Sequence, residues 1–178
     1  MKRHGVVVDA SVARASSDGA VTPAPECVAA LEAILSGGVS VLQFEEIQVE
    51  WRRHGSRYFA RWVTRAYGAR RMARCVLGTL AVLSDRLKAA AGREDDARAM
   101  TKDAHLVAAG IEHGGRVLSL DEAARRLFAG VGGQFGDVGG VHWANPAVAE
   151  ERVVEWLRAG APADDSRRLK AAANLSLQ

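Results

Sequence analysis

This chain of 178 residues has few of the residues that would build a disulfide framework or a zinc site. Its only two cysteines, Cys27 and Cys75, stand far apart in the sequence and form no zinc-ligand pattern. We expect both to be small, buried apolar residues of a protein that works in a reducing compartment.

Long apolar runs are also missing. No stretch approaches the roughly 20 apolar residues that a membrane-spanning helix needs. Basic residues 2–4 precede the apolar run Val6–Val8, but Asp9 ends that run too early for a signal peptide. We therefore predict a cytoplasmic protein with no membrane partner.

Glycine is present, but not in a phosphate-binding loop. The glycine-rich segment 130–140 is not followed by Gly-Lys-Ser/Thr, so it predicts a flexible loop rather than a P-loop. The rest of the composition is that of an ordinary soluble domain, with 48% hydrophobic and 25% charged residues. A net charge of +3 is mildly basic and compatible with an anionic partner.

Short apolar runs alternate with amphipathic stretches along the chain. Strands are predicted at 6–8, 39–42, 116–120 and 141–143, and helices at 23–35, 44–54, 57–67, 76–87, 101–113, 122–128 and around 153–157. Residues 92–98 read as a surface loop or a short helix. This alternation indicates an α/β protein with a parallel sheet covered on both faces. We expect one domain over residues 1–160 and a polar, loosely held tail over 161–178.

Four acidic residues carry the functional signal: Asp9, Glu46, Asp103 and Asp121. Asp9 and Asp121 each end an apolar strand, and the carboxyl ends of parallel strands meet at the edge of a sheet where ligands bind. Several carboxylates do not stay ionised together without a cation, and oxygen-only ligands suit Mg²⁺ or Mn²⁺. The sequence therefore predicts a metal-dependent phosphodiester enzyme in which these four acids are catalytic and bind the metal.

Each acid also has a simpler explanation. An aspartate at the start of a helix caps free N–H groups, and Glu46 alone is typical of a solvated helix residue. The combination favours a site, because Ser11 and Ser119 each stand two residues from an aspartate, where a hydroxyl can orient a carboxylate. Glu50 lies one helical turn beyond Glu46 and is the alternative metal-binding glutamate.

Four stretches in order along the chain share a pattern with one family. They are residues 7–11, which contain Asp9; residues 39–47, which contain Glu46; residues 102–110, which begin with Lys102 and Asp103; and residues 116–121, which end in Ser119-Leu120-Asp121. Over about residues 5 to 145 the chain resembles the PIN-domain family of Mg²⁺/Mn²⁺-dependent nucleases. That family includes the toxins of many bacterial toxin–antitoxin pairs.

The resemblance implies a fold, an activity and partners. The fold would be a three-layer α/β/α PIN-like domain with a central, mainly parallel sheet. The activity would be an endoribonuclease that leaves 5′-phosphate and 3′-hydroxyl ends, with RNA as substrate and an antitoxin protein as partner. The many apolar helices are compatible with a homodimer.

The chain also departs from the family. Residues 51–100 are longer than in compact members, and Ala123 stands where some members carry another acid. Two other functions remain open. One is a catalytically silent PIN-like module that binds RNA or protein. The other is a phosphohydrolase of the haloacid dehalogenase type, which wants a second acid at the position of Ser11.

The segment 51–74 contains eight arginines and no acid. Arg57, Arg61 and Arg65 recur every four residues and so share one helical face. Arginines interleaved with aromatic residues suit contacts to an RNA backbone and its bases. The same pattern also fits a helix whose Tyr58 and Trp62 face the core while its arginines are solvated.

Overall fold

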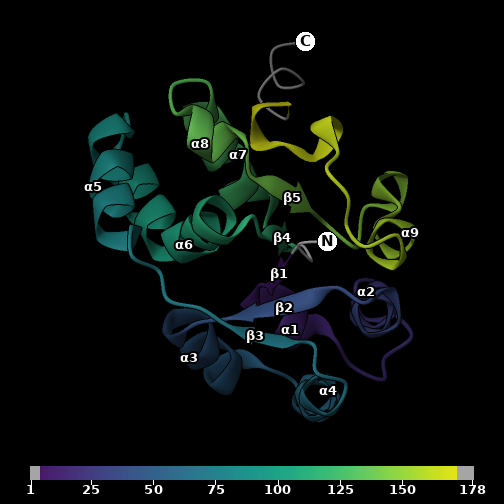
Figure 1. Cartoon of the computed structure of the whole chain (residues 1–178). Coiled ribbons are helices and arrows are strands. Elements are labelled where there is room, and N and C mark those ends of the chain that lie inside the picture. Colours follow the sequence, from purple (N-terminus) through teal and green to yellow (C-terminus); the bar gives the residue numbers. More distant parts are fainter. Residues whose placement is uncertain (1–4, 172–178) are drawn as a thin grey trace.

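A computed structural model describes residues 5–171 of the chain. Its centre is a five-stranded sheet in the order β3-β2-β1-β4-β5, in which every strand pair is parallel (Figure 1). The strands are β1 (Gly5–Val8), β2 (Ser40–Gln43), β3 (Met72–Arg74), β4 (Arg116–Leu118) and β5 (His142–Ala144). The predicted α/β fold with a parallel central sheet is therefore confirmed.

Helices cover both faces of this sheet and complete three layers. They are α1 (Ala10–Ala15), α2 (Ala24–Gly37), α3 (Glu45–His54), α4 (Arg57–Gly68), α5 (Leu80–Ala90), α6 (Glu94–His113), α7 (Glu122–Gly132), α8 (Gly136–Gly139) and α9 (Val153–Arg158). Figure 1 shows α5 beside α6 on one side of the sheet and α2 beside α9 on the other. None of the helices within residues 5–171 has the length and apolar character to cross a membrane.

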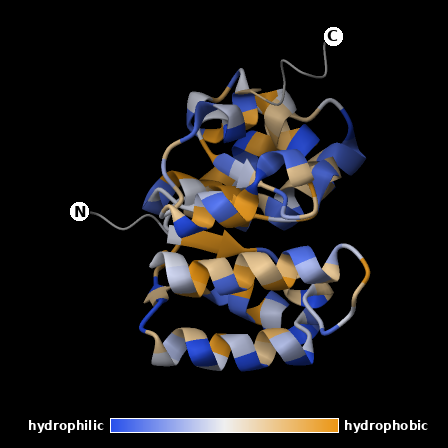
Figure 2. Ribbon diagram, turned by 90° about the vertical axis from the view of Figure 1, so that its right-hand side faces the viewer, coloured by the Kyte–Doolittle hydropathy of each residue, from blue (hydrophilic) through white to orange (hydrophobic). Residues whose placement is uncertain are grey.

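The core explains why these strands form where they do. Val6, Val7 and Val8 are completely buried, as expected for a β-branched run in a strand covered on both faces. In Figure 2 the hydrophobic strands lie between the helices, and most of the hydrophilic residues are on the helices. Two buried indoles tie helices to this centre: the Nε1 of Trp51 donates to the carbonyl of Val8 at 2.7 Å, and that of Trp62 to Leu31 at 2.9 Å.

Strand register decides which residues meet at the functional edge. Val6 pairs with Val41 of β2 on one side and with Arg116 of β4 on the other. All five strands point the same way, so their carboxyl ends lie along one edge of the sheet. Of the four acids that the sequence assigned to the site, Asp9, Glu46 and Asp121 follow β1, β2 and β4, and Asp103 lies on α6.

Three local predictions need correction. Strand β3 was not predicted, because this short and partly exposed edge strand lies in a run of arginines and lacks an apolar pattern. Helix α6 begins at Glu94 rather than at residue 101, and three acids in its first turn complement the helix dipole. The glycine-rich loop 130–140 contains the end of α7 and the short helix α8.

The predicted loose tail is also wrong for its described part. Ala161 and Leu169 are completely buried, and the backbone N–H of Leu169 donates to the carbonyl of Val141 at 2.9 Å. These apolar residues hold the segment against the end of the sheet at β5. Residues 172–178 of the predicted tail lie outside the described residues. Of the two cysteines, Cys27 is fully buried and Cys75 is half-buried.

Candidate functional site

Asp9 follows β1 and stands at the N-cap position of the short helix α1, but its side chain makes no capping hydrogen bond. Two serine hydroxyls donate to the same oxygen of its carboxylate: Ser11 at 2.5 Å and Ser119 at 2.7 Å. Each serine then accepts a backbone N–H from the loop after β4, Ser11 from Leu120 and Ser119 from Asp121, both at 3.0 Å. The serines therefore orient Asp9 and join the loops that follow β1 and β4, and the sequence predicted that these hydroxyls would orient a carboxylate.

Asp121 stands at the end of that second loop and begins α7. Its Oδ1 accepts the backbone N–H of Ala124 at 2.8 Å, which is the geometry of a helix cap. The simpler explanation for this residue is thus realised in the structure. It uses one carboxylate oxygen only, and Oδ2 makes no hydrogen bond with the described residues.

Asp103 reaches the same edge from the middle of α6. Its side chain is 17% exposed, and the only cation paired with it within residues 5–171 is Lys102, at 3.8 Å. The pKa of Asp103 is raised from 3.8 to about 6, mainly by burial and in smaller part by the negative charges of Asp9, Asp121 and Glu50, while the charge of Lys102 opposes the rise. The structure thus brings three predicted aspartates within electrostatic reach of one another.

The two glutamates of α3, Glu46 and Glu50, differ in their effect on the pKa of Asp103. Glu46 is exposed and is absent from the charges that act on Asp103, whereas Glu50 is among them. Glu50 also lies 3.5 Å from the ring of His54. Of the two alternatives that the sequence left open, Glu50 is the glutamate that the structure couples to Asp103.

His105 lies two residues after Asp103 on α6 and is buried. Its Nδ1 is 3.1 Å from the carbonyl of Lys102, and its ring meets Phe44 edge-on, with ring centroids 6.0 Å apart. Burial lowers the pKa of His105, and the nearby carboxylates oppose that effect only in part. A neutral, packed imidazole fits the structural role that the sequence favours for it.

The chemistry of these donors fits a hard divalent cation. The group consists of carboxylates and hydroxyls, which are ligands for Mg²⁺ or Mn²⁺ rather than for zinc. The pKa of Asp103 is raised mainly by burial, and the neighbouring carboxylates add to that rise. Within residues 5–171, however, no three His, Cys, Asp or Glu side chains converge closely enough to hold a metal ion as they stand.

The predicted RNA-contacting arginines lie on α4, and two of them are already paired. Arg65 makes a two-pronged contact with Glu32 of α2, with distances of 2.6 and 2.7 Å, and Tyr58 donates to the same carboxylate. Arg61 lies 3.5 Å from Asp18. Arg57 is exposed at the start of α4. The predicted face thus mostly joins α4 to its neighbours.

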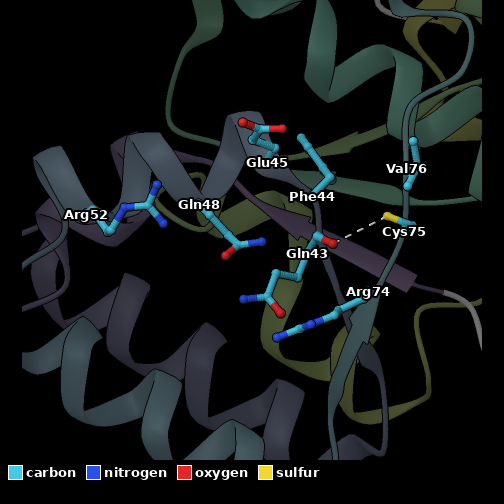
Figure 3. Close-up of a pocket in the computed structure, with 8 residues that line it drawn as sticks. All are labelled: Gln43, Phe44, Glu45, Gln48, Arg52, Arg74, Cys75 and Val76. Carbon is cyan, nitrogen blue, oxygen red and sulfur yellow. Dashed lines mark hydrogen bonds between the residues drawn. The ribbon is translucent and has the colours of Figure 1, made fainter.

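The sequence did not identify a recess at the carboxyl ends of β2 and β3. It has a volume of about 410 Å³ and is lined by Gln43, Phe44, Glu45, Gln48, Arg52, Arg74, Cys75 and Val76 (Figure 3). The arginine-rich composition of segment 51–74 was the available signal. It did not indicate which arginines would reach the sheet edge, because that depends on the unpredicted strand β3.

Comparisons with known proteins leave the family open. A scan against protein-family models finds no match to this chain, and searches of curated proteins and of solved structures find none either. The functional assignment therefore depends on the residues and geometry described above.

Proposed function

We propose that this protein is a Mg²⁺- or Mn²⁺-dependent endoribonuclease of the PIN type. The observation that carries the proposal is the arrangement at the ends of β1 and β4. There Asp9 is oriented by Ser11 and Ser119 beside Asp121, and Asp103 on α6 experiences both of their charges. The sheet order and the family resemblance of the four sequence stretches support the same assignment.

The carboxylates would hold the metal, and the serines would position one of them. Asp9, Asp103 and Asp121 supply the ligands, together with Glu50 or Glu46 from α3. The hydroxyls of Ser11 and Ser119 both donate to Oδ2 of Asp9. These two bonds fix the orientation of the carboxylate and therefore the direction of its Oδ1. The bound cation would lower the pKa of a water nucleophile and offset the charge that develops on the phosphate.

The decisive experiment is metal-dependent cleavage of a mixed RNA pool. Wild-type protein is compared with Asp9→Asn and Asp103→Asn, which remove a ligand charge with little change in shape. The matched control is Asp95→Asn, an exposed aspartate in the first turn of the same helix as Asp103. We expect the first two variants to lose cleavage by about a hundredfold or more, because several kcal/mol of charge stabilisation disappears, and the control to retain it.

A second measurement reports on the metal without relying on activity. Mn²⁺ should raise the melting temperature of the wild type, since a ligand that binds only the folded state stabilises it by about 2.7 kcal/mol at a hundred times its Kd. Asp103→Asn should lose most of this increase and Asp95→Asn none of it. Equal cleavage by all four proteins would indicate a contaminant and would overturn the proposal.

One observation favours a second function. Because no three acids within residues 5–171 converge on a common point, a catalytically silent PIN-like module that binds RNA or protein is the alternative. It predicts RNA binding that is unaffected by Mn²⁺ and by Asp103→Asn, with no cleavage. An antitoxin partner, a homodimer and a cytoplasmic location remain predictions of the sequence.

A further inference from the structure

The recess at the ends of β2 and β3 continues into a second one. The neighbouring cavity has a volume of about 320 Å³ and shares Gln43, Gln48 and Arg52 with the first. Its other walls come from Trp51, Phe59 and Val63 and from the turn between α3 and α4. The two cavities therefore form one groove, which we call the α3 groove, with a polar half and an apolar half.

The polar half carries positive charge that the described residues do not neutralise. Within residues 5–171 the side chains of Arg52 and Arg74 form neither an ion pair nor a hydrogen bond, in contrast to those of Arg61 and Arg65. Figure 3 shows Arg52 on α3 and Arg74 on β3 on opposite sides of Gln43 and Gln48. Burial raises the pKa of Cys75, so this residue adds a neutral thiol rather than a negative charge.

Among the residues that the structure describes, Glu45 is the only carboxylate that lines either half. It lies in the first turn of α3, and in Figure 3 it is above Gln43 and Gln48, whereas Arg74 is below them. An anion would therefore be attracted to the part of the groove near the arginines and repelled from the part near Glu45.

The side-chain amides of Gln43 and Gln48 line both cavities, where the charged and the apolar halves meet. Gln43 is buried, and its Oε1 accepts from the hydroxyl of Tyr67 at 2.7 Å, so its Nε2 remains as a donor. Gln48 adds a second amide, which can both donate and accept. Two amides above an apolar floor of Trp51, Phe59 and Val63 suit a flat heterocycle with a polar rim.

The α3 groove lies on the same edge of the sheet as the aspartates. Gln43 pairs with Arg74 at the ends of β2 and β3, and β2 is the direct neighbour of β1. Adjacent strands are about 4.8 Å apart, so the end of β3 lies about 10 Å from the end of β1 along this edge. An extended nucleic-acid strand at the aspartates can therefore continue into the groove.

We infer that the α3 groove is a subsite for one nucleotide of single-stranded RNA next to the cleaved bond. Its phosphate lies between Arg52 and Arg74, and its base lies in the apolar half against Trp51, with its edge hydrogen-bonded to Gln43 and Gln48. Charge-assisted contacts to phosphate together with burial of a base are the usual means of holding a single strand. This inference rests on the proposed ribonuclease function, which names the polymer.

The test measures binding without cleavage. A short fluorescent single-stranded RNA is titrated in EDTA with wild type, Arg52→Ala, Arg74→Ala and Gln48→Ala, and with Arg53→Ala as control. Arg53 is an exposed arginine of the same helix that does not line the groove. We expect each of the two groove arginine variants to bind about tenfold more weakly, as for the loss of one charge-assisted hydrogen bond, while the control binds like wild type.

Salt dependence separates phosphate contact from other causes. Each groove arginine that contacts phosphate should lower the slope of log K against log salt by about 0.7 when it is removed. Gln48→Ala should weaken binding without changing that slope, because it removes a base contact. Unfolding curves of each variant check that these exposed substitutions leave the fold intact.

The outcomes distinguish this inference from the proposed function. Equal losses in all three arginine variants, no loss in any variant, or no binding by wild type would overturn the subsite. Cleavage that persists while Arg52→Ala and Arg74→Ala bind normally would reject the subsite and keep the ribonuclease. Selective loss of binding in a protein that never cleaves would keep the groove as a binding site and reject the ribonuclease.

Discussion

Two groups of carboxylates at the same edge of the sheet are treated in opposite ways. Beside β5, Glu151 lies 2.5 Å from Arg125 and 3.2 Å from Arg167, and Arg125 also contacts Glu122. Beside β1 and β4, Asp9 and Asp121 meet hydroxyls and backbone N–H groups, and Asp103 has only a solvated lysine. The side chains of Glu151 and Asp103 are exposed to nearly the same extent, 15% and 17%.

Burial therefore does not distinguish the two groups; the source of the compensating charge does. In the β5 group the charge of Glu151 is compensated by Arg125 and Arg167. The β1/β4 group has no arginine beside it within residues 5–171, and under the proposed function a bound divalent cation would supply the missing positive charge.

The largest change in the free energy of unfolding should come from removing Glu151 and its two ion pairs. Glu151→Ala leaves Arg125 and Arg167, which are 13% and 9% exposed, without their shared carboxylate. Breaking a buried pair by removing one partner costs about 3–5 kcal/mol. We expect a loss of this size in the free energy of unfolding, measured by urea denaturation. Glu150→Ala, its exposed neighbour, should change it by less than about 0.5 kcal/mol, and equal effects of the two would remove the contrast.

Removing the charge of Asp103 from the β1/β4 group should change the free energy of unfolding with the opposite sign. In EDTA at pH 7, Asp103→Asn should raise the free energy of unfolding by about 1–3 kcal/mol, because it removes a carboxylate whose pKa is raised in the folded state. A loss of stability in this variant would mean that the β1/β4 group is already compensated.

The pH dependence of that difference gives the sign independently. The folded-state pKa of Asp103 is about 6 and the reference value is 3.8, so between these values the folded protein holds a proton that the unfolded chain has released. Wild-type stability from this group is therefore full below about pH 4 and is lost as pH rises to about 6. Denaturation of wild type and Asp103→Asn in EDTA should converge near pH 4 and separate above it.

A smaller effect is expected at the serine that joins the two loops. Ser119 is completely buried, and its hydroxyl donates to Asp9 and accepts from the N–H of Asp121. Ser119→Ala should cost about 1–2 kcal/mol of stability, since Asp9 keeps its bond from Ser11. Ser17→Ala, at an exposed serine, is the matched control in thermal unfolding. No difference between the two would show that the hydroxyl does not hold the site together.

The smallest effect should come from a carboxylate paired in water. The ion pair between Arg65 and Glu32 joins α4 to α2, but its side chains are 55% and 38% exposed. Arg65→Ala should therefore lower the free energy of unfolding by less than about 1 kcal/mol, and less still at high salt. A loss as large as that of Glu151→Ala would show that solvent exposure does not decide the value of these pairs.

Most of the fold was predictable because strong local patterns determine it. The buried run at Val6–Val8, the amphipathic stripe of α2 and the glycines that follow it place their elements within a few residues. Strand β3 was missed because its partly exposed residues gain their order from pairing with β2, which is a long-range contact. The described tail was misjudged because Ala161 and Leu169 are too few to form a pattern.

The candidate site was predictable where it depends on strand ends and not where it depends on helix rotation. Asp9 and Ser119 are placed by the register of β1 and β4, so the hydrogen bond between them follows from the positions of the strand ends in the sequence. The choice between Glu46 and Glu50 depends on how α3 is turned against the sheet. The arginines that face the groove depend in addition on β3, so sequence periodicity pointed to a face of α4 instead.

One hydrogen bond gives α3 a further consequence. The indole of Trp51 is anchored to the carbonyl of Val8, the residue before Asp9, and the same helix carries the groove residues Gln48 and Arg52. The helix therefore holds these groove residues at a fixed distance from the end of β1. If the proposed ribonuclease function holds and the groove selects a base, the cut in the RNA falls at a constant number of nucleotides from that base, and a shift of the Trp51 hydrogen bond would move the position of cleavage rather than change its rate.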